Sequence, residues 1–194
     1  MSDKTDSKRQ YIIDKATEVF SKKGYKNVTM KDIVEACEIS RGGLYLYYSS
    51  TEELFLDVVK NAEEKESGGR DIGKMLDESS MSDLVVWFIK EQKKEILGRG
   101  NSLVVAKFEY AFYCRQEDKE SMAKSEFDTA TKVLQTLLER GAQSGEFECM
   151  SPKSTAANMM YTITGLKAAA ASYNLSEKKI DAQLVYMMRQ FMDV

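Results

Sequence analysis

Apolar residues recur every three or four positions along most of the chain, which is the spacing of one face of an α-helix. The first such stretch runs from about residue 8 to Lys23, and Gly24 follows it as a typical end of a helix. Alternating runs rich in valine or threonine, which would indicate strands, are few. Further helices are expected near 30–37, 40–48, 51–66, 71–77, 82–98, 101–116, 118–143, 153–173 and 177–192. The pattern predicts an all-α fold of about nine helices.

Two of the expected helices are short and lie close together. Thr29 precedes the first of them, and Asp32 stands three residues later, as in an acidic variant of the capping box. A connection of about three residues leads to Ser40, which can cap the second helix, and Ser50 with Glu53 forms another capping box before the next one. This spacing predicts a helix-turn-helix over about residues 29–48.

Composition removes most catalytic chemistry. The 194 residues include no histidine, which excludes Ser-His-Asp and Cys-His nucleophile systems and HExxH zinc sites within this chain. The three cysteines are far apart and without CxxC spacing, so we expect free thiols in the core rather than a disulfide framework or a metal site. With no phosphate-binding loop or metal-spaced cluster, we expect neither an enzyme, a metal nor a cofactor.

The chain also lacks the patterns of export and membrane insertion. Its polar start, MSDKTDSKRQ, has no apolar core of a signal peptide, and the run Leu84–Ile89 is too short to span a bilayer. We therefore expect a cytoplasmic protein with no membrane contact. The net charge of -3 hides a modest asymmetry, because residues 1–50 hold nine basic and seven acidic side chains. That asymmetry alone does not identify a partner.

The stretch SRGGLYLYY, residues 40–48, raises the main functional question. Two glycines weaken a short helix by roughly 2 kcal/mol, so another interaction should offset them. In the second helix of a helix-turn-helix, glycine allows the backbone to approach DNA closely, and Arg41 can donate to a guanine edge or a phosphate. Leu44 and Tyr48 share another face and are expected in the core. The alternative is that the glycines form a turn and the tyrosines are ordinary core residues.

The residues around this stretch resemble the TetR family of transcriptional regulators over about residues 8–58. The similar positions are Ile12, Ile13, Ala16, Phe20, Gly24, Tyr25, Val28, Thr29, Met30, Ile33, Ala36, Ile39, Ser40, Gly42, Leu44, Tyr45, Tyr47, Tyr48, Ser50, Glu52, Glu53, Leu54 and Phe55. The resemblance implies a DNA-binding domain at 1–50 and a larger helical domain at 51–194 that binds ligand and dimerises, with residues 51–66 as the connecting helix.

The resemblance also implies which residues contact DNA. Phosphates are expected mainly at Thr29 and Thr51, and base edges mainly at Arg41, Gly43 and Tyr45. The full expected set is Thr29, Ser40, Arg41, Gly42, Gly43, Tyr45, Tyr47 and Thr51. Three departures alter individual contacts: Cys37-Glu38-Ile39 replaces the usual Ala-Gly-Val, Tyr47-Tyr48 replaces His-Phe, and Thr51 replaces a common lysine.

The later helices carry many aromatic and methionine side chains that suit either a ligand pocket or a plain bundle core. The candidate pocket residues are Trp87, Phe108, Glu109, Phe112, Met122, Phe127 and Met159. Glu109 is either a solvated glutamate or a carboxylate on an apolar face, and the second reading would favour a lipophilic cation as effector.

Small residues on 153–173 and an apolar stripe on the last helix predict an interface between two copies of the chain. The residues are Gly165, Ala168, Ala169, Ser172, Leu184, Met188 and Phe191. The family implied by the resemblance commonly forms such a homodimer, which would bind a pseudo-palindromic operator in double-stranded DNA.

Together these features favour a ligand-responsive, DNA-binding transcriptional regulator, a repressor that a small-molecule effector releases from its operator. Two alternatives remain at this stage: a helical small-molecule-binding protein without operator specificity, and an enzyme.

Overall fold

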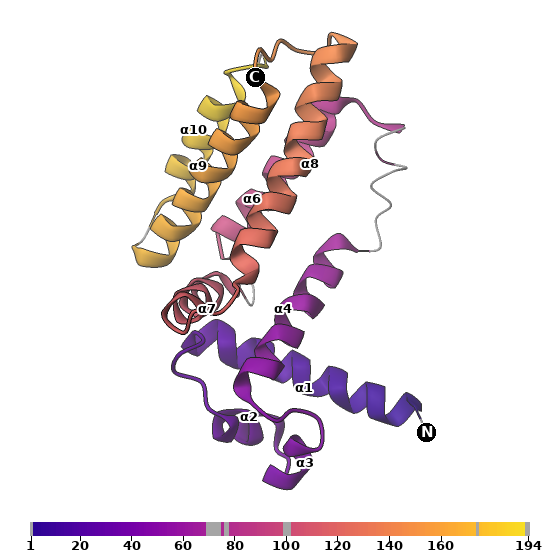
Figure 1. Ribbon diagram of the computed structural model, residues 1–194, viewed down its shortest axis with the longest axis vertical. Helices are drawn as coiled ribbons and strands as arrows, with labels where there is room; N and C mark the ends of the chain where they lie inside the picture. Colours follow the sequence, from indigo (N-terminus) through magenta and orange to yellow (C-terminus); the bar gives the residue numbers. More distant parts are fainter. Residues whose placement is uncertain (1, 69–74, 76–77, 99–101, 174, 193–194) are drawn as a thin grey trace. The chain divides into compact units, whose positions relative to one another are not determined.

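The computed structural model describes residues 2–68, 75, 78–98, 102–173 and 175–192. All regular structure in these residues is helical, which confirms the all-α prediction (Figure 1). The helices are α1 (Ser2–Lys23), α2 (Met30–Cys37), α3 (Arg41–Tyr45), α4 (Thr51–Ser67), α6 (Met81–Ile96), α7 (Val104–Gln116), α8 (Met122–Ser144), α9 (Pro152–Ser172) and α10 (Glu177–Met188). The helix expected at 71–77 lies outside the described residues, apart from Met75.

The chain divides into two compact units. The N-terminal unit comprises Met1–Arg70 and Gly100–Glu120, and the C-terminal unit comprises Asp71–Arg99 and Ser121–Val194. Helix α7 therefore packs with the N-terminal helices, although α6 and α8 on either side of it in the sequence belong to the C-terminal unit. This division describes packing, whereas the predicted domains 1–50 and 51–194 divide the chain by role and stay a prediction.

Helices α1 and α4 form the centre of the N-terminal unit. Ile12, Ala16 and Phe20 repeat at four-residue intervals on α1 and are fully buried, as is Phe55 on α4. Helix α7 adds Tyr110, whose ring lies 5.2 Å from that of Phe55. These aromatic side chains thus join α7, which is distant in sequence, to the N-terminal helices.

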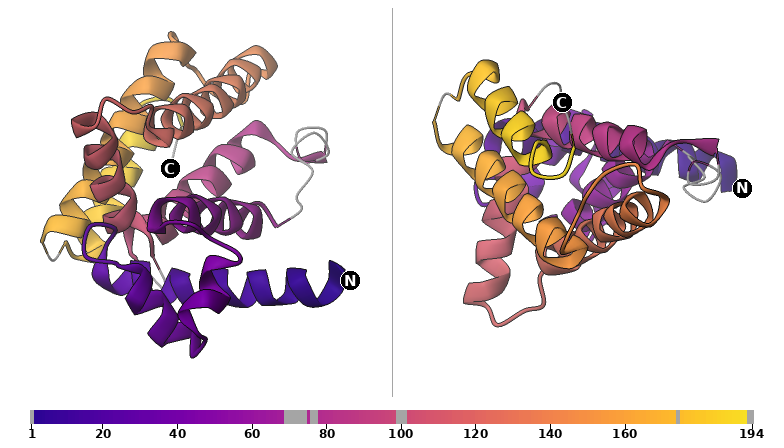
Figure 2. Two further views of the ribbon diagram at one scale, coloured as in Figure 1. Left: turned by 60° about the horizontal axis from the view of Figure 1, so that its bottom comes forward. Right: turned by 90° about the horizontal axis from the view of Figure 1, so that it is seen from above.

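The C-terminal unit is a bundle of α6, α8, α9 and α10 around one apolar core (Figure 2). Leu184, Met188 and Phe191, predicted to lie at a dimer interface, are buried in this core with exposed fractions of 8% or less. The apolar stripe of the last helix is therefore covered by the protomer's own helices. No helix among the described residues is long and apolar enough to cross a membrane.

Two helix boundaries differ from the sequence expectation. Helix α8 begins at Met122 rather than near 118, because Asp118 adopts a left-handed backbone conformation with φ of 53° that interrupts the helical path after α7. Helix α10 ends at Met188, and residues up to Phe191 continue as a turn against the core.

Candidate functional site

The start of α2 carries the expected capping box. Thr29 Oγ1 accepts from the Asp32 amide at 3.3 Å, and the Thr29 amide donates to Asp32 Oδ2 at 2.7 Å. Lys23 Nζ lies 2.5 Å from Asp32 Oδ1. The hydrogen bonds from Lys23 and then Thr29 hold the pKa of Asp32 well below its usual range. A phosphate at this helix end would therefore meet a fixed carboxylate beside the Thr29 hydroxyl.

The turn between α2 and α3 forms without glycine. Glu38, which replaces the glycine common in similar sequences, adopts the left-handed conformation with φ of 52°. Its backbone amide still bonds to the carbonyl oxygens of Val34 and Glu35 at the end of α2. This conformation destabilises a residue with a side chain by roughly 1 kcal/mol, and the turn between α2 and α3 forms in spite of it.

Helix α3 is only five residues long, and Ser40 caps it by accepting from the Gly43 amide at 3.1 Å. Neither Gly42 nor Gly43 has a positive φ, so the backbone does not require glycine there. A Cβ built on Gly42 meets no atom within 4 Å, and one on Gly43 meets only Ser40 Oγ at 3.1 Å. Backbone conformation and packing within the unit therefore do not explain the two glycines.

The exposed side of α3 combines charge, hydrogen-bonding groups and apolar surface. The Arg41 guanidinium carbon lies 5.4 Å from the centre of the Tyr45 ring, and Tyr45 is 42% exposed. Tyr47 is partly buried, and Leu46 between the two tyrosines is 83% exposed. Guanidinium and phenol groups suit base edges and phosphates, and an exposed leucine suits a thymine methyl group.

The opposite side of this segment is fixed by Leu44 and Tyr48, which are 0% and 1% exposed. The Tyr48 hydroxyl donates to Asp57 Oδ2 on α4 at 2.8 Å. Arg9 on α1 donates to both groups, with Nη2 2.5 Å from Asp57 Oδ2 and Nε 3.2 Å from the Tyr48 oxygen. This Arg9–Asp57–Tyr48 network joins α1 and α4 to the residues that follow α3.

At neutral pH the Tyr48 phenol and the Asp57 carboxyl group of this network differ in protonation. Burial raises the pKa of Tyr48 to about 12, so the phenol keeps its proton. Burial also tends to raise the pKa of Asp57, but the hydrogen bonds from Arg9 and Tyr48 outweigh this and lower it. The carboxylate therefore stays charged and can accept from both partners.

Thr51 begins α4 and is partly buried. Ser50 caps this helix by accepting from the Glu53 amide at 3.1 Å, and Glu53 Oε2 accepts from the Ser49 amide at 2.7 Å. Glu52 is bound by Lys119, whose Nζ lies 2.8 Å from Oε2. The phosphate contact expected at Thr51 stays a prediction.

Glu109 has a different role from either of those considered. Its Oε2 atom accepts from the backbone amides of Tyr25 and Lys26 at 2.6 and 2.9 Å. A Cβ on Gly24, whose φ is 75°, would come within 2.4 Å of the same oxygen. The carboxylate thus holds the connection between α1 and α2 against α7, which accounts for an acidic side chain here without a cationic ligand.

The structure divides the other candidate pocket residues between the two units. Phe108 is partly buried and Phe112 is 60% exposed, both on α7 of the N-terminal unit. In the C-terminal unit, Met159 is fully buried, and Trp87 and Phe127 pack against the same core. Met122 is partly buried at the start of α8. The core around Met159 therefore brings three of the seven together.

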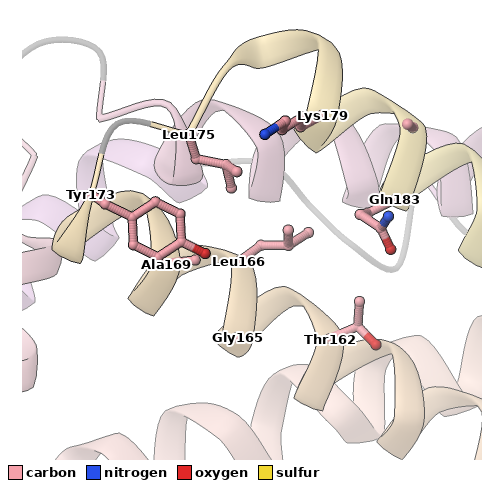
Figure 3. Close-up of a pocket in the computed structure, with 9 residues that line it drawn as sticks. Thr162, Gly165, Leu166, Ala169, Tyr173, Leu175, Lys179 and Gln183 are labelled. Carbon is pink, nitrogen blue, oxygen red and sulfur yellow. The ribbon is translucent and has the colours of Figure 1, made fainter.

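A groove of about 530 Å³ runs between α9 and α10 on the C-terminal unit (Figure 3). Gly165 and Ala169 of α9 form part of its wall, and Lys179 and Gln183 of α10 face them. Ala168 and Ser172 lie on the same helix, partly buried and exposed respectively. The small residues predicted for an interface are thus accessible, unlike the apolar residues of the last helix.

Sequence reasoning missed Arg9, Asp57 and Leu46. The signal for the first two was Tyr48 itself, because a tyrosine at a core position usually needs a hydrogen-bond partner for its hydroxyl. Nothing in the sequence placed Arg9 and Asp57 beside it, since they lie 39 and 9 residues away. Leu46 falls within the helix expected at 40–48, whereas α3 ends at Tyr45.

Two family models match the chain. Residues 12–58 match "Bacterial regulatory proteins, tetR family", and residues 84–182 match "Tetracyclin repressor-like, C-terminal domain".

Individual proteins agree with these matches. The uncharacterized HTH-type transcriptional regulator YfiR of Bacillus subtilis is 29% identical over 91% of this chain and 85% of its own length. The negative transcriptional regulator of the biofilm operon icaADBC, IcaR of Staphylococcus epidermidis, is 40% identical over 26% of this chain and 27% of its own. A transcriptional regulator from Saccharomonospora viridis, solved with choline, superposes with a TM-score of 0.75 at 14% identity over 95% of both chains.

Substituting Gly42→Ala separates DNA contact from folding. The added methyl group meets no protein atom, and alanine favours the helix by about 1 kcal/mol, so the thermal unfolding midpoint should stay or rise. DNA affinity should nevertheless fall by about tenfold or more, because the backbone is held away from the groove. Calorimetry and a gel shift on the same preparation measure both quantities. Unchanged DNA affinity would show that Gly42 has no role in close approach.

Tyr48→Phe and Tyr45→Phe form a matched pair that removes one hydroxyl each. Tyr48→Phe should lower the free energy of unfolding by about 1–2 kcal/mol, since a buried hydrogen bond to a charged carboxylate is lost. Tyr45→Phe should leave stability within about 0.5 kcal/mol and weaken DNA binding, because this hydroxyl is on the exposed face. Denaturant unfolding distinguishes the two variants, and equal stability losses would contradict the assignment.

Proposed function

The chain belongs to the TetR family of bacterial regulatory proteins, and from this premise we propose that it is a homodimeric repressor released from its operator by a small-molecule effector. It acts as a DNA-binding transcriptional regulator, as does the family to which it belongs. The repressor sense, the dimer, the effector and a cytoplasmic location make up the proposal. IcaR, a negative regulator that is similar over 26% of this chain, supports the repressor sense.

The observation that carries the proposal is the pair Gly42-Gly43. Both glycines weaken α3, and neither is required by backbone conformation or by packing within the unit. Because the two glycines have no side chain, a DNA backbone or base edge can come close to this face of α3. The Arg41 guanidinium over Tyr45 then lies where direct readout of bases needs a donor.

We propose a role for each of the candidate residues. Arg41, Gly43 and Tyr45 read base edges in the major groove. Ser40, Tyr47 and Thr51 contact phosphates through their hydroxyls, whereas at Thr29, whose hydroxyl donates to Asp32 at 2.6 Å, only the backbone at the start of α2 is left for a phosphate. Leu46, which is 83% exposed beside Tyr45, adds an apolar contact to a thymine methyl group.

The groove between α9 and α10 is where we propose that a second copy of the chain packs. Gly165 is exposed, so another helix can approach α9 closely. Tyr161, one turn before Gly165, and Tyr186, one turn after Ala182 on α10, are each 68% exposed and extend the same two helix faces. Large exposed tyrosines beside small residues are typical of an association surface.

Effector binding in the C-terminal unit reaches DNA through α7 in this proposal. The chain enters α7 from α6 and leaves it into α8, and both of these belong to the C-terminal unit. Glu109 binds α7 to the connection that precedes the helix-turn-helix. A shift of α6 and α8 on effector binding therefore moves α7 and changes the spacing of the two recognition helices.

Gel shifts with the DNA that flanks its own gene test the proposed repressor. The wild-type protein should bind saturably and prefer this DNA to a scrambled sequence. Arg41→Ala should reduce that preference by about 1–3 kcal/mol. Lys31→Ala, an exposed control on α2, should weaken binding to both DNAs alike. Binding that ignores sequence, with Arg41→Ala unchanged, would reject an operator-specific regulator.

The dimer is tested by Gly165→Glu. The protomer has room for the side chain, because a Cβ there meets no atom within 4 Å, so its secondary structure should be unchanged. Dimer affinity measured by sedimentation should fall by about tenfold or more, since a charge enters a close helix contact. Thr129→Glu, at an exposed position of α8, is the control and should not affect assembly. Equal dimer affinities in the two variants would place the interface elsewhere.

A further inference from the structure

Gln92 on α6 has a buried oxygen without a partner. Its Oε1 atom is shielded from solvent and accepts no hydrogen bond, and it is alone in this among the side-chain nitrogen and oxygen atoms of the described residues. Most buried polar atoms in native proteins are paired, because an unpaired one opposes folding. The position of Gln92 therefore requires an explanation beyond the stability of the bundle.

The neighbours of Gln92 on α6 show which face of the helix it occupies. Phe88 and Ile89 lie one turn before it and Ile96 lies one turn after it, and all three are buried in the core of the C-terminal unit. Gln92 thus stands on the core-facing stripe of α6, where the sequence otherwise places apolar side chains. Leucine at this position would complete the stripe without an unpaired group.

The polar side chains that join α6 to its neighbours are already engaged. Glu95, one turn from Gln92, accepts from Lys167 of α9 at 2.5 Å. Lys93 is paired with Asp181 and Glu177 of α10 at 2.6 and 2.9 Å. Both lysine ammonium groups therefore serve carboxylates rather than the Gln92 oxygen.

We infer that Gln92 is the polar anchor of the effector site, and that the effector is a neutral small molecule with an apolar body and one N–H or O–H donor. The inference rests on the proposed function, in which the C-terminal unit binds an effector. A donor is needed because the amide oxygen only accepts, and an apolar body is needed because Phe88, Ile89 and Ile96, one turn away on the same face of α6, belong to the apolar core. A charged ligand would lose its hydration without a counter-charge at this oxygen.

Thermal unfolding of the full chain without ligand tests the unpaired oxygen. Gln92→Leu should raise the unfolding midpoint by about 2–4 °C, because it removes an unsatisfied acceptor and extends the apolar stripe. The matched control is Gln135→Leu on α8, where the partly buried amide already donates to Glu139 at 2.7 Å, and no rise is expected. A midpoint of Gln92→Leu that stays or falls would mean that the oxygen is satisfied and would overturn the inference.

The ligand class is tested with two isomers, 1-octanol and heptyl methyl ether, which differ in a single O–H donor. Trp87, the single tryptophan, lies on α6 against the same core and reports binding by its fluorescence. The wild type should bind octanol about tenfold more tightly than the ether, and Gln92→Leu should lose this preference. Equal affinities in the wild type, or no saturable signal from octanol, would contradict the proposed class.

Gel shifts on the same preparations keep this inference separate from the proposed function. Gln92→Leu should bind operator DNA as the wild type does, because Gln92 lies in the C-terminal unit, far in sequence from the helix-turn-helix. If the wild type fails to select operator DNA, the regulator proposal fails. If operator binding is normal and the octanol preference is absent, only the effector inference fails.

Discussion

The segment that we propose reads DNA depends on anchoring from outside itself. Helix α3 has five residues, two of them glycine, and a helix this short is not stable alone. Its orientation comes from the buried side chains of Leu44 and Tyr48 and from the hydrogen bonds of Tyr48 with Asp57 of α4 and Arg9 of α1. The two glycines of α3 are tolerated because these anchors supply the order that the helix lacks.

The same dependence extends to regulation. Tyr25 follows α1, and its ring lies 4.9 Å from Tyr110 of α7, while its amide donates to Glu109. The connection before the recognition motif is therefore fixed by an element that continues at both ends into the C-terminal unit. A carboxylate that accepts two backbone amides has a defined position, so in the regulation that we propose a movement of α7 is passed to this connection rather than absorbed by a flexible side chain.

Local patterns predicted the fold well, and long-range contacts limited the prediction of the sites. Capping at Thr29, Ser40 and Ser50 and the burial of Leu44 follow from short-range spacing, and the structure agrees with each. Glu109 was misread because its partners are 83 and 84 residues away. The stripe with Leu184, Met188 and Phe191 was assigned to a dimer because periodicity shows that a face is buried, but not whether the covering helix belongs to the same chain.

The central claim is that two copies of α3, held by their anchors, read DNA together. Hydroxyl-radical footprinting of the region that flanks the gene tests it most directly, because it maps backbone protection at single nucleotides. We expect two protected half-sites related by approximate two-fold symmetry, with centres about one helical turn of 10–10.5 base pairs or a multiple of it apart. A single protected block without symmetry, or uniform weak protection of any sequence, would contradict the account.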